Sequence, residues 1–157
     1  MKRQDKYPDT NYFKFYNANP KNRIDDDCAI RAIATFLQQP WVDTVIAMTK
    51  CGITQGRVIN SPKNIEAYLK TIGLVKMKQP RFADNRKMTG KQFVTMFSDE
   101  CIANIGGKHI VYIGNHRVYD IWDSTNGTIG NFWVYQKDVN YAKRFLADVS
   151  DLYSNEV

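Results

Sequence analysis

The chain has 157 residues, of which 43% are hydrophobic and 13% aromatic. This length can bury a core without disulfides or metals, and the composition excludes a disordered chain, so we expect one domain over residues 1–157. The 22 lysines and arginines outnumber the 16 aspartates and glutamates and give a net charge of +6. Residues 1–11 are polar and charged, which is typical of a flexible N-terminal arm.

A short strand and four helices are predicted in the first part of the chain. The aromatic run 12–16 predicts an extended segment. The carboxylates of residues 25–27 offer an N-cap to a largely buried helix that continues from Cys28 to about Gln39. Cap, proline and glycine signals place the next three helices over 41–50, 62–73 and 89–97.

After Cys101 the hydrophobic pattern alternates with period two, which is typical of strands with one face in a core. Strands are predicted over 101–105, 109–113, 116–122 and 132–135, and Asp138 is predicted to cap a final helix. Helices that precede a run of antiparallel strands indicate an α+β fold.

Two of these strands form a predicted hairpin around Gly114-Asn115. If these residues are a two-residue loop, His109 faces Asp120 across the ribbon. Directly opposed side chains have Cβ atoms roughly 5 Å apart. The pattern therefore predicts an imidazole beside a carboxylate.

Cys28 is the predicted nucleophile that completes this set. A thiol reacts as the thiolate, which the dipole and the free N–H groups at the start of a helix favour. His109 is then the general base and acid, and Asp120 orients its ring. Asn22, six residues before Cys28, is expected to donate its amide to the oxyanion together with the Cys28 backbone N–H.

Each of these residues also has a purely structural interpretation. A cysteine in a helix usually packs, and a histidine opposite an aspartate can simply stabilise two strands. Asn22 can cap or turn the chain. Asp123 is most simply a turn cap, and it is the alternative carboxylate if the hairpin register differs. The hypothesis of a catalytic site depends on the joint occurrence of these residues.

The other cysteines, Cys51 and Cys101, lack a comparable setting. An odd number of cysteines without CxxC spacing argues against a disulfide framework and a structural zinc site, so no metal or cofactor is expected. No apolar stretch approaches membrane-spanning length, and no secretory signal follows the charged first residues. We therefore expect a reduced cytoplasm and no membrane partner.

A basic stretch follows the predicted third helix. With Asp84 as its only acid, it indicates either a solvated loop or a surface for an acidic protein substrate. No nucleic-acid-binding signature accompanies it, so nucleic acid is not expected as a partner. Its basic residues are Lys76, Lys78, Arg81, Arg86, Lys87 and Lys91.

The helix-borne cysteine, the histidine that heads a later strand and the aspartate on the next strand resemble the papain-like superfamily of cysteine peptidases. In that family a glutamine six residues before the cysteine supplies the oxyanion donor, and Asn22 has that spacing here. More closely, roughly residues 12 to 135 are similar to small papain-like proteins of bacteriophages and prophages. The segments that carry this likeness are Asn19-Pro20, Asp27-Cys28, Arg31-Ala32, Trp41, Gly107-x-His109 with Val111, and Tyr119-Asp120-Ile121-Trp122-Asp123-Ser124.

The resemblance implies a papain-like α+β fold in which the helix that bears Cys28 packs against a C-terminal antiparallel sheet. It also implies cleavage of an amide, isopeptide or related acyl bond in a protein or peptide, without a cofactor. A phage-encoded protein of this kind would act in the host cytoplasm on a host protein. Acyl transfer on the same triad, or a catalytically degenerate binding or inhibitor protein such as a counter-defence protein, are the alternatives.

Two positions depart from the pattern of that family. Its members tend to have Gly-Asp-Cys, whereas this chain has Asp26-Asp27-Cys28, and carboxylates beside a thiol disfavour the thiolate. Asn22 is shorter by one methylene than the glutamine it replaces, which loosens its contact with an oxyanion.

Overall fold

A computed structural model describes residues 1–157. The α-helices, in chain order, are α1 (Arg3–Lys6), α2 (Cys28–Leu37), α3 (Trp41–Gln55), α4 (Pro62–Thr71), α5 (Gly90–Met96) and α6 (Val139–Ser150). The short 3-10 helices η1 (Gln136–Asp138) and η2 (Ser154–Glu156) flank α6. None of the helices combines the length and the hydropathy needed to cross a membrane.

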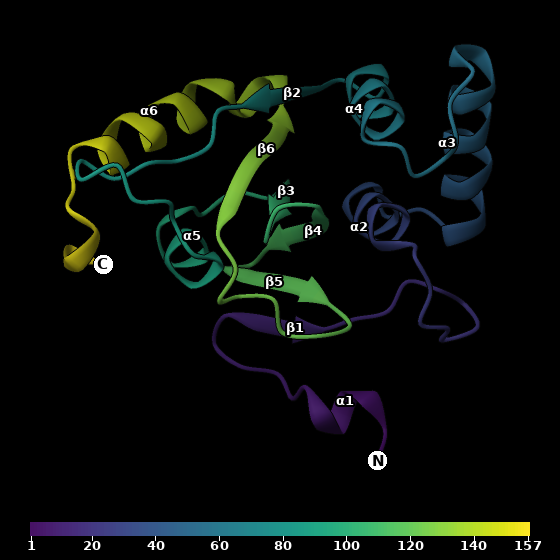
Figure 1. Cartoon of the computed structure of the whole chain (residues 1–157), viewed down its shortest axis with the longest axis horizontal. Coiled ribbons are helices and arrows are strands. Elements are labelled where there is room, and N and C mark those ends of the chain that lie inside the picture. The colour runs from purple at the N-terminus through teal and green to yellow at the C-terminus, as the bar shows by residue number, and fades with distance from the viewer.

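The strands form one sheet of six strands, with the spatial order β1-β5-β4-β3-β6-β2 (Figure 1). Neighbouring strands are antiparallel, except that β1 runs parallel to β5. In chain order the strands are β1 (Phe13–Phe15), β2 (Leu74–Met77), β3 (Cys101–Ile105), β4 (His109–Gly114), β5 (Arg117–Asp120) and β6 (Ile129–Tyr135).

The predicted combination of helices with a mainly antiparallel sheet is confirmed, but the sheet is not built from the C-terminal part alone. Both edge strands, β1 and β2, precede the run of central strands in the sequence. The sequence does not predict β2, because this strand has only four residues and Lys76 interrupts its apolar pattern. The basic stretch that begins at Lys76 therefore starts in the edge strand β2, and not in a loop.

Helices cover both faces of the sheet: α2, α3 and α4 lie on one side, and α5 and α6 lie on the other (Figure 1). The strands pack against the helices on both faces of the sheet, because alternate side chains point to opposite faces. On β3, Ile102 packs with α2 and α4, whereas Cys101 and Ala103 pack with α5 and α6. The molecule thus has three layers, and α2 is packed on the central strand β4.

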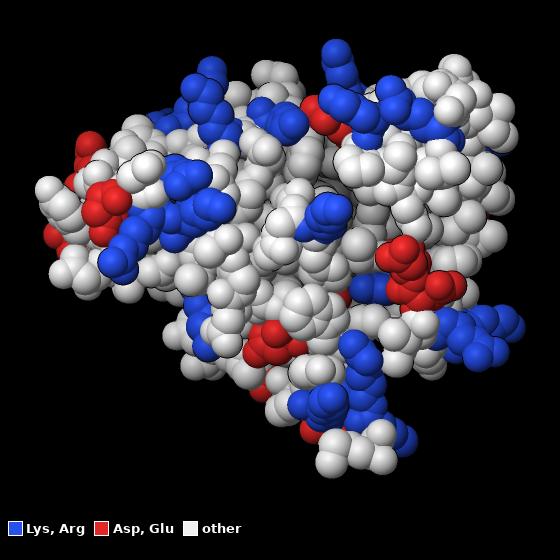
Figure 2. All heavy atoms as spheres, in the orientation of Figure 1, with Lys and Arg blue, Asp and Glu red and all other residues white.

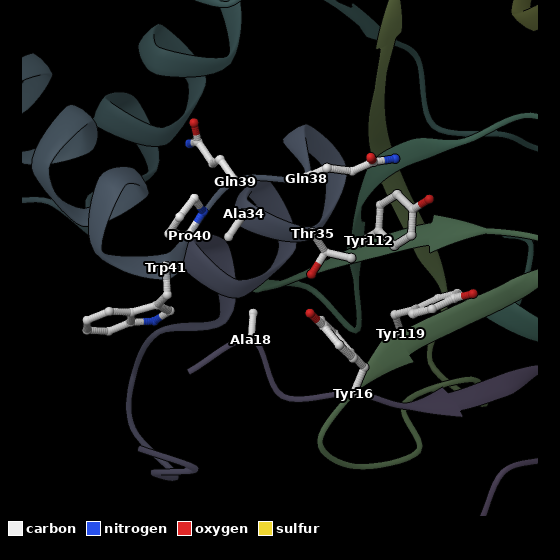
Figure 3. A pocket seen from close by; sticks show the side chains of 10 residues that line it. All are labelled: Tyr16, Ala18, Ala34, Thr35, Gln38, Gln39, Pro40, Trp41, Tyr112 and Tyr119. Carbon is white, nitrogen blue, oxygen red and sulfur yellow. The ribbon is translucent and has the colours of Figure 1, made fainter. Parts of the chain in front are cut away.

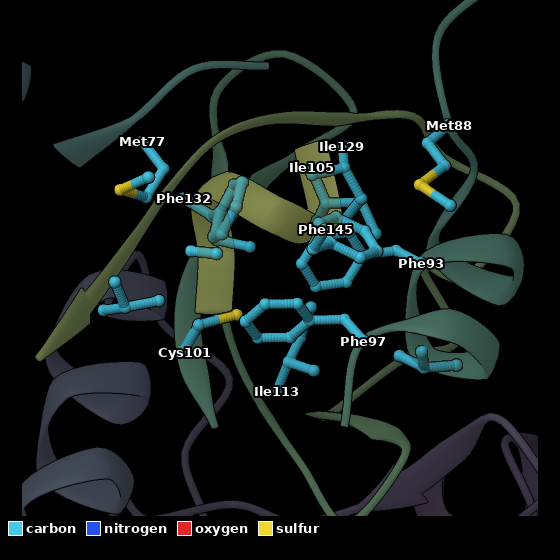
Figure 4. Packing of buried hydrophobic residues seen from close by; sticks show 14 of the residues in the cluster. Met77, Met88, Phe93, Phe97, Cys101, Ile105, Ile113, Ile129, Phe132 and Phe145 are labelled. Carbon is cyan, nitrogen blue, oxygen red and sulfur yellow. The ribbon is translucent and has the colours of Figure 1, made fainter. Parts of the chain in front are cut away.

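Four phenylalanines from α5, β6 and α6 form the centre of one core (Figure 4). The rings of Phe93 and Phe97 stack with centroids 4.9 Å apart, and the ring of Phe145 meets that of Phe97 edge-on at 5.0 Å. Phe132 lies 5.3 Å from Phe93 and 5.5 Å from Phe97. These offset and edge-to-face arrangements are the favourable ones for aromatic rings and fix α5 and α6 on the sheet.

Two helices differ from their predicted lengths at the C-terminal end. α2 ends at Leu37, because Gln38 adopts a left-handed conformation with φ 52°. α3 continues past Lys50 to Gln55 and is capped by Gly56. The prediction that α3 ends before Gly52 is wrong: this glycine lies inside the helix, where an added Cβ atom would lie 2.4 Å from the carbonyl oxygen of Arg57.

The hairpin between β4 and β5 turns at Asn115-His116, so the prediction of a Gly114-Asn115 loop is wrong. Both loop residues have positive φ, 51° and 59°, as a two-residue type I′ loop requires. His116 adopts this conformation, and its Nδ1 lies 2.6 Å from the carbonyl oxygen of Val94 in α5. Gly114 belongs to β4, where an added Cβ atom would lie 2.3 Å from the hydroxyl oxygen of Tyr112.

The observed register moves the strand partners by two residues and keeps each side chain on its predicted face. Ile113 pairs with Val118, so continuation of the pairing places Val111 opposite Asp120. His109 does not face Asp120 directly, as predicted, but is its diagonal neighbour on the same face. Because only an odd shift would move a side chain to the other face, the imidazole and the carboxylate still meet.

Part of the segment expected as a flexible arm is helical and touches the domain. Residues Arg3–Lys6 form α1, and the Arg3 guanidinium donates a hydrogen bond to the carbonyl oxygen of Ile121 at 2.6 Å. This contact brings the first residues next to the end of β5.

Truncation of one ring in the phenylalanine cluster is expected to destabilise the fold. Phe97 is fully buried, so Phe97→Ala should lower the free energy of unfolding by about 3–5 kcal/mol through lost burial and a residual cavity. Chemical denaturation measures this change. Ile53→Ala on α3, where the side chain is 74% exposed, is the matched control and should change the free energy by less than about 0.5 kcal/mol. Equal effects of the two substitutions would contradict this packing.

Candidate active site

Cys28 is the first residue of α2, and its helix begins with unpaired backbone donors. The first hydrogen bond of the helix joins the Arg31 N–H to the Asp27 carbonyl oxygen at 2.9 Å. Asp27 occupies the N-cap position, but its carboxylate caps no backbone N–H. The N–H groups of Cys28, Ala29 and Ile30 therefore have no acceptor within the chain. Their partial positive charge favours an anion at this point.

The thiol of Cys28 lies against the start of β4. Strand β5 pairs with β4 only as far as Tyr112, which faces Tyr119, so the first residues of β4 have a free edge on that side. The backbone N–H of Ile110 and the ring of His109 both lie close enough to the Cys28 sulfur to lower the pKa of its thiol. A helix N-terminus, a strand backbone and an imidazole thus meet at one sulfur atom.

The imidazole of His109 is bonded to the carboxylate of Asp120. His109 Nε2 lies 2.5 Å from Asp120 Oδ2, which leaves Nδ1 as the ring nitrogen that faces Cys28. The indole of Trp122 lies beside the ring, with centroids 5.1 Å apart, and shields it from solvent. The side chains of His109 and Asp120 are accordingly only 18% and 2% exposed. The structure thus brings the three predicted catalytic residues together.

Every oxygen of the Asp120 carboxylate has a partner. Oδ1 accepts hydrogen bonds from the Ile121 N–H at 2.8 Å and from Arg31 Nη2 at 3.3 Å. Oδ2 accepts the bond from His109 and a further bond from the Ser124 hydroxyl at 3.3 Å. This carboxylate is therefore fixed in one orientation.

Arg31 also binds Asp27, so two carboxylates share its guanidinium. Its Nη1 contacts Asp27 Oδ1, while Asp27 Oδ2 accepts hydrogen bonds from Trp41 Nε1 at 3.0 Å and from Asn19 Nδ2 at 3.2 Å. From the sequence, Asp27 is expected as an N-cap and as a neighbour of the thiol, and Asn19, Arg31 and Trp41 have no role beyond the quoted resemblance. The spacing of Asp27 and Arg31, four residues apart on one helix, is the signal that predicts their ion pair.

The ionisation of the thiol and of the imidazole is shifted toward the charged pair. Burial acts to raise the pKa of Cys28, but its hydrogen bonds with His109 and the Ile110 N–H lower this pKa below its ordinary value. Burial acts against the imidazolium, but hydrogen bonds with Asp120 and Cys28 raise the pKa of His109 from 6.5 to about 9. The contact between the two groups therefore shifts both pKa values in the direction that favours a thiolate beside an imidazolium.

A groove of about 450 Å³ opens beside Cys28. Its walls come from the start of α2, the turn before α4 and the turn between β3 and β4, and strands of the sheet form its floor. Among its lining residues are Cys28, Asn60, Ile65, Lys108, Ile110 and Trp133. A substrate in this groove would lie with its acyl group against the sulfur.

Asn22 and Asp123 lie outside this constellation. Asn22 is exposed in a turn with φ 52°, and it is not among the residues that line the groove beside Cys28. Asp123 accepts hydrogen bonds from the backbone N–H of Thr125 at 3.0 Å and from its hydroxyl at 2.6 Å. Asp123 thus has the turn-capping role that the sequence offers as its simplest interpretation.

The six basic residues of 76–91 are all exposed, and several of them make local contacts. Lys76 lines the groove and pairs with Glu66 at 3.0 Å. Arg81 donates to a backbone carbonyl within its own turn, whereas Lys91 lies over the ring of Tyr12. The other three, Lys78, Arg86 and Lys87, are exposed. Figure 2 shows lysine and arginine side chains in several separate groups on the viewed face.

The remaining cysteines have settings that differ from that of Cys28. Cys101 is buried in the phenylalanine core, and this burial, together with nearby Asp99 and Glu100, raises the pKa of its thiol well above the ordinary value. Cys51 lies in α3, where its sulfur accepts a hydrogen bond from Gln55 Nε2 at 3.1 Å. No three His, Cys, Asp or Glu side chains are grouped so as to hold a metal ion.

A second cavity of about 590 Å³ lies at the other end of α2 (Figure 3). Uncharged side chains line it, including Tyr16, Thr35, Trp41, Tyr112 and Tyr119. The hydroxyl groups of Tyr16 and Thr35 point toward each other across the cavity (Figure 3). Trp41 connects this cavity to the candidate active site through its bond to the N-cap carboxylate of α2, and the Thr35 hydroxyl donates to the carbonyl oxygen of Arg31 at 2.7 Å.

Comparison of the chain with models of protein families, with curated proteins and with solved structures finds no match.

Alkylation by iodoacetamide is expected to be selective for Cys28 and to occur at a lower pH than alkylation of a free thiol. Because its pKa is lowered, the rate should reach half its maximum below about pH 8.5, the midpoint of a free thiol. Mass spectrometry of the modified chain at a series of pH values measures this rate. Cys28→Ala should abolish the reaction at neutral pH, whereas Cys51→Ala and Cys101→Ala should not. Equal labelling of all three thiols would exclude an activated Cys28.

The bond between His109 and Asp120 is expected to make the stability pH-dependent. A histidine whose pKa is raised on folding contributes stability that is complete below pH 6.5 and is lost as the pH rises through about 9. In a Cys28→Ala background, which removes the thiol titration and leaves Asp120 as the contact that raises the His109 pKa, His109→Gln should cost most at low pH and progressively less as the pH rises. Denaturation at several pH values measures the difference. A cost that is independent of pH would contradict the raised pKa.

Proposed function

We propose that this chain is a papain-like cysteine hydrolase that cleaves an amide, isopeptide or related acyl bond in a protein or peptide. The observation that carries this proposal is the sequence of contacts from the Cys28 thiol through the His109 ring to the Asp120 carboxylate, with 2.5 Å between His109 Nε2 and Asp120 Oδ2. A thiol, an imidazole and a carboxylate in this order at a helix N-terminus form the arrangement that activates a cysteine for acyl transfer.

The reaction takes place in two halves. First, the Cys28 sulfur attacks the carbonyl carbon of the substrate; a carbon–sulfur bond forms, the carbon–nitrogen bond breaks, and the departing amine takes a proton from His109. Water then attacks the thioester and gives a proton to His109, and the acid product leaves as the carbon–sulfur bond breaks. Asp120 keeps Nδ1 of the ring directed at the sulfur in both halves.

Negative charge develops on the carbonyl oxygen during each attack, and the start of α2 supplies donors for it. The unpaired N–H groups of Cys28 and Ala29 lie next to the nucleophile, where they stabilise an oxyanion without rearrangement. This assignment relies on backbone donors, and the predicted amide donor Asn22, which is exposed, is not required for it.

The contacts around Asp27 support the papain-like part of the proposal. The separate sequence segments that carry the likeness to papain-like phage proteins contribute Asn19, Asp27, Arg31, Trp41 and Asp120. These residues form one buried hydrogen-bonded network behind the triad. A shared motif whose scattered parts meet in one network is best explained by a shared site.

A mixture of peptides from a digested bacterial proteome tests the function directly. The wild-type chain is expected to generate new peptide N-termini, detected by amine labelling and mass spectrometry, and Cys28→Ala should generate none. Products that carry a new amide to an added amine, instead of a free acid, would indicate acyl transfer. Cleavage that persists in Cys28→Ala would exclude Cys28 as the nucleophile.

Asp120→Asn is expected to lower turnover in the same assay by about 10²–10⁴-fold, because the amide cannot stabilise the imidazolium. The isosteric change leaves the shape of the site intact, which circular dichroism verifies. Asp123→Asn is the matched control, because this carboxylate serves a turn and is expected to leave turnover within about threefold. The opposite ranking would show that Asp123 is the functional carboxylate.

A further inference from the structure

We propose that Arg31 is a positioning residue for this site: it holds the Asp120 carboxylate in the orientation that serves His109 and ties the helix of Cys28 to the strand of Asp120. This inference rests on the proposed function and adds a residue to it that touches neither the substrate nor the reacting atoms.

The location of Arg31 allows both effects. It lies three residues after Cys28, about one turn further along α2. Its side chain is only 7% exposed and is directed toward Asp120, which is 89 residues away in the sequence. A single buried guanidinium therefore connects the element that carries the nucleophile with the element that carries the carboxylate.

The two oxygens of the Asp120 carboxylate bind different partners, and this difference shows what Arg31 contributes. Oδ1 accepts from Arg31 at 3.3 Å and from a backbone N–H at 2.8 Å, and Oδ2 remains for His109 at 2.5 Å. Rotation of the carboxylate would break the bonds on both sides at once. Without Arg31, one oxygen would keep only the backbone N–H as its partner, and the carboxylate could turn away from the imidazole.

Asp27 holds the Arg31 guanidinium in place. Its Oδ1 contacts Arg31, and its Oδ2 is held by Trp41 and Asn19 at 3.0 and 3.2 Å. The guanidinium is a planar fork that can bind two carboxylates at once, which a lysine ammonium cannot do with the same geometry. Two buried anions therefore fix one buried cation between them.

Acidic and basic groups alternate from this network to the thiol, in the order Asp27, Arg31, Asp120, His109 and Cys28. Arg31 also acts on the thiol directly, because its positive charge helps to lower the pKa of Cys28. The charged and titratable groups that adjoin or face Cys28 are His109 on β4, Arg31 on α2, Asp26 and Asp27 before α2, Lys108 in the turn before β4, and Glu66 and Lys76 across the groove.

Two changes remove the contribution of Arg31 in different ways. Asp27→Asn combined with Arg31→Met removes one buried charge of each sign, so no carboxylate at position 27 is left without its cation. Arg31→Lys keeps the positive charge but loses the fork, and it covers the case in which the double variant does not fold. Phe36→Ala, a buried position on the same helix outside the network, is the control for destabilisation alone.

The measurements are the pH dependence of Cys28 alkylation by iodoacetamide, the proton NMR signal of the His109 ring N–H that faces Asp120, and the melting temperature. Both Arg31 variants are expected to raise the alkylation midpoint and to lose or shift the ring signal. The double variant should react about tenfold more slowly at neutral pH, which corresponds to one unit of midpoint shift. Phe36→Ala should lower the melting temperature and leave the midpoint and the signal unchanged.

The outcomes separate this inference from the proposed function. A wild-type midpoint near the free-thiol value would overturn both. A lowered wild-type midpoint that stays the same in Arg31→Lys and in the double variant, with only the melting temperature changed, would overturn the positioning role of Arg31 and leave the thiol–imidazole site intact. A shift of the midpoint in Phe36→Ala as large as in the Arg31 variants would also overturn it, because destabilisation alone would then explain the effect.

Discussion

The ion pair between Arg31 and Asp120 joins the two parts of the candidate active site, and the arrangement of the other groups depends on it. Arg31 belongs to the helix that begins with Cys28, whereas Asp120 ends β5. Both groups are buried, so each needs its charged partners: Arg31 has Asp27 and Asp120, and Asp120 has Arg31 and His109. Apolar side chains pack α2 on the sheet, and the ion pair adds a polar connection between the helix of the thiol and the strand of the carboxylate.

The meeting of His109 with Asp120 could be predicted from the sequence, because it depends on alternation along the strands and not on the exact turn. A loop at Asn115-His116 in place of Gly114-Asn115 moves the partners by two residues, which leaves every side chain on its face. The starts of α4 and α5 were predictable for a similar reason, since their capping signals are local and are confirmed. Patterns of this kind need no knowledge of the tertiary fold.

Contacts between distant segments could not be predicted in this way. Asn22 has the required spacing from Cys28, but the left-handed turn in which it lies is exposed to solvent, and the groove takes an asparagine, Asn60, from the segment before α4 instead. The bond between Arg31 and Asp120 has no sequence signal at all, whereas the bond between Arg31 and Asp27 follows from four-residue spacing on a helix. Spacing fixes a distance only where one regular element spans it.

The carboxylates of residues 25–27 show how the fold decides an electrostatic question that the sequence leaves open. Side by side with Cys28 in the sequence, they oppose ionisation of its thiol. In the fold, however, Asp27 is turned to Arg31, and the first two carboxylates are exposed, where water and salt screen their charge. The groups least screened from the sulfur are buried ones, His109 and Arg31, and both lower the pKa of the Cys28 thiol against the effect of burial. An acidic turn next to the thiol is compatible with a lowered thiol pKa because two of its carboxylates are exposed and the buried one, Asp27, is paired with Arg31.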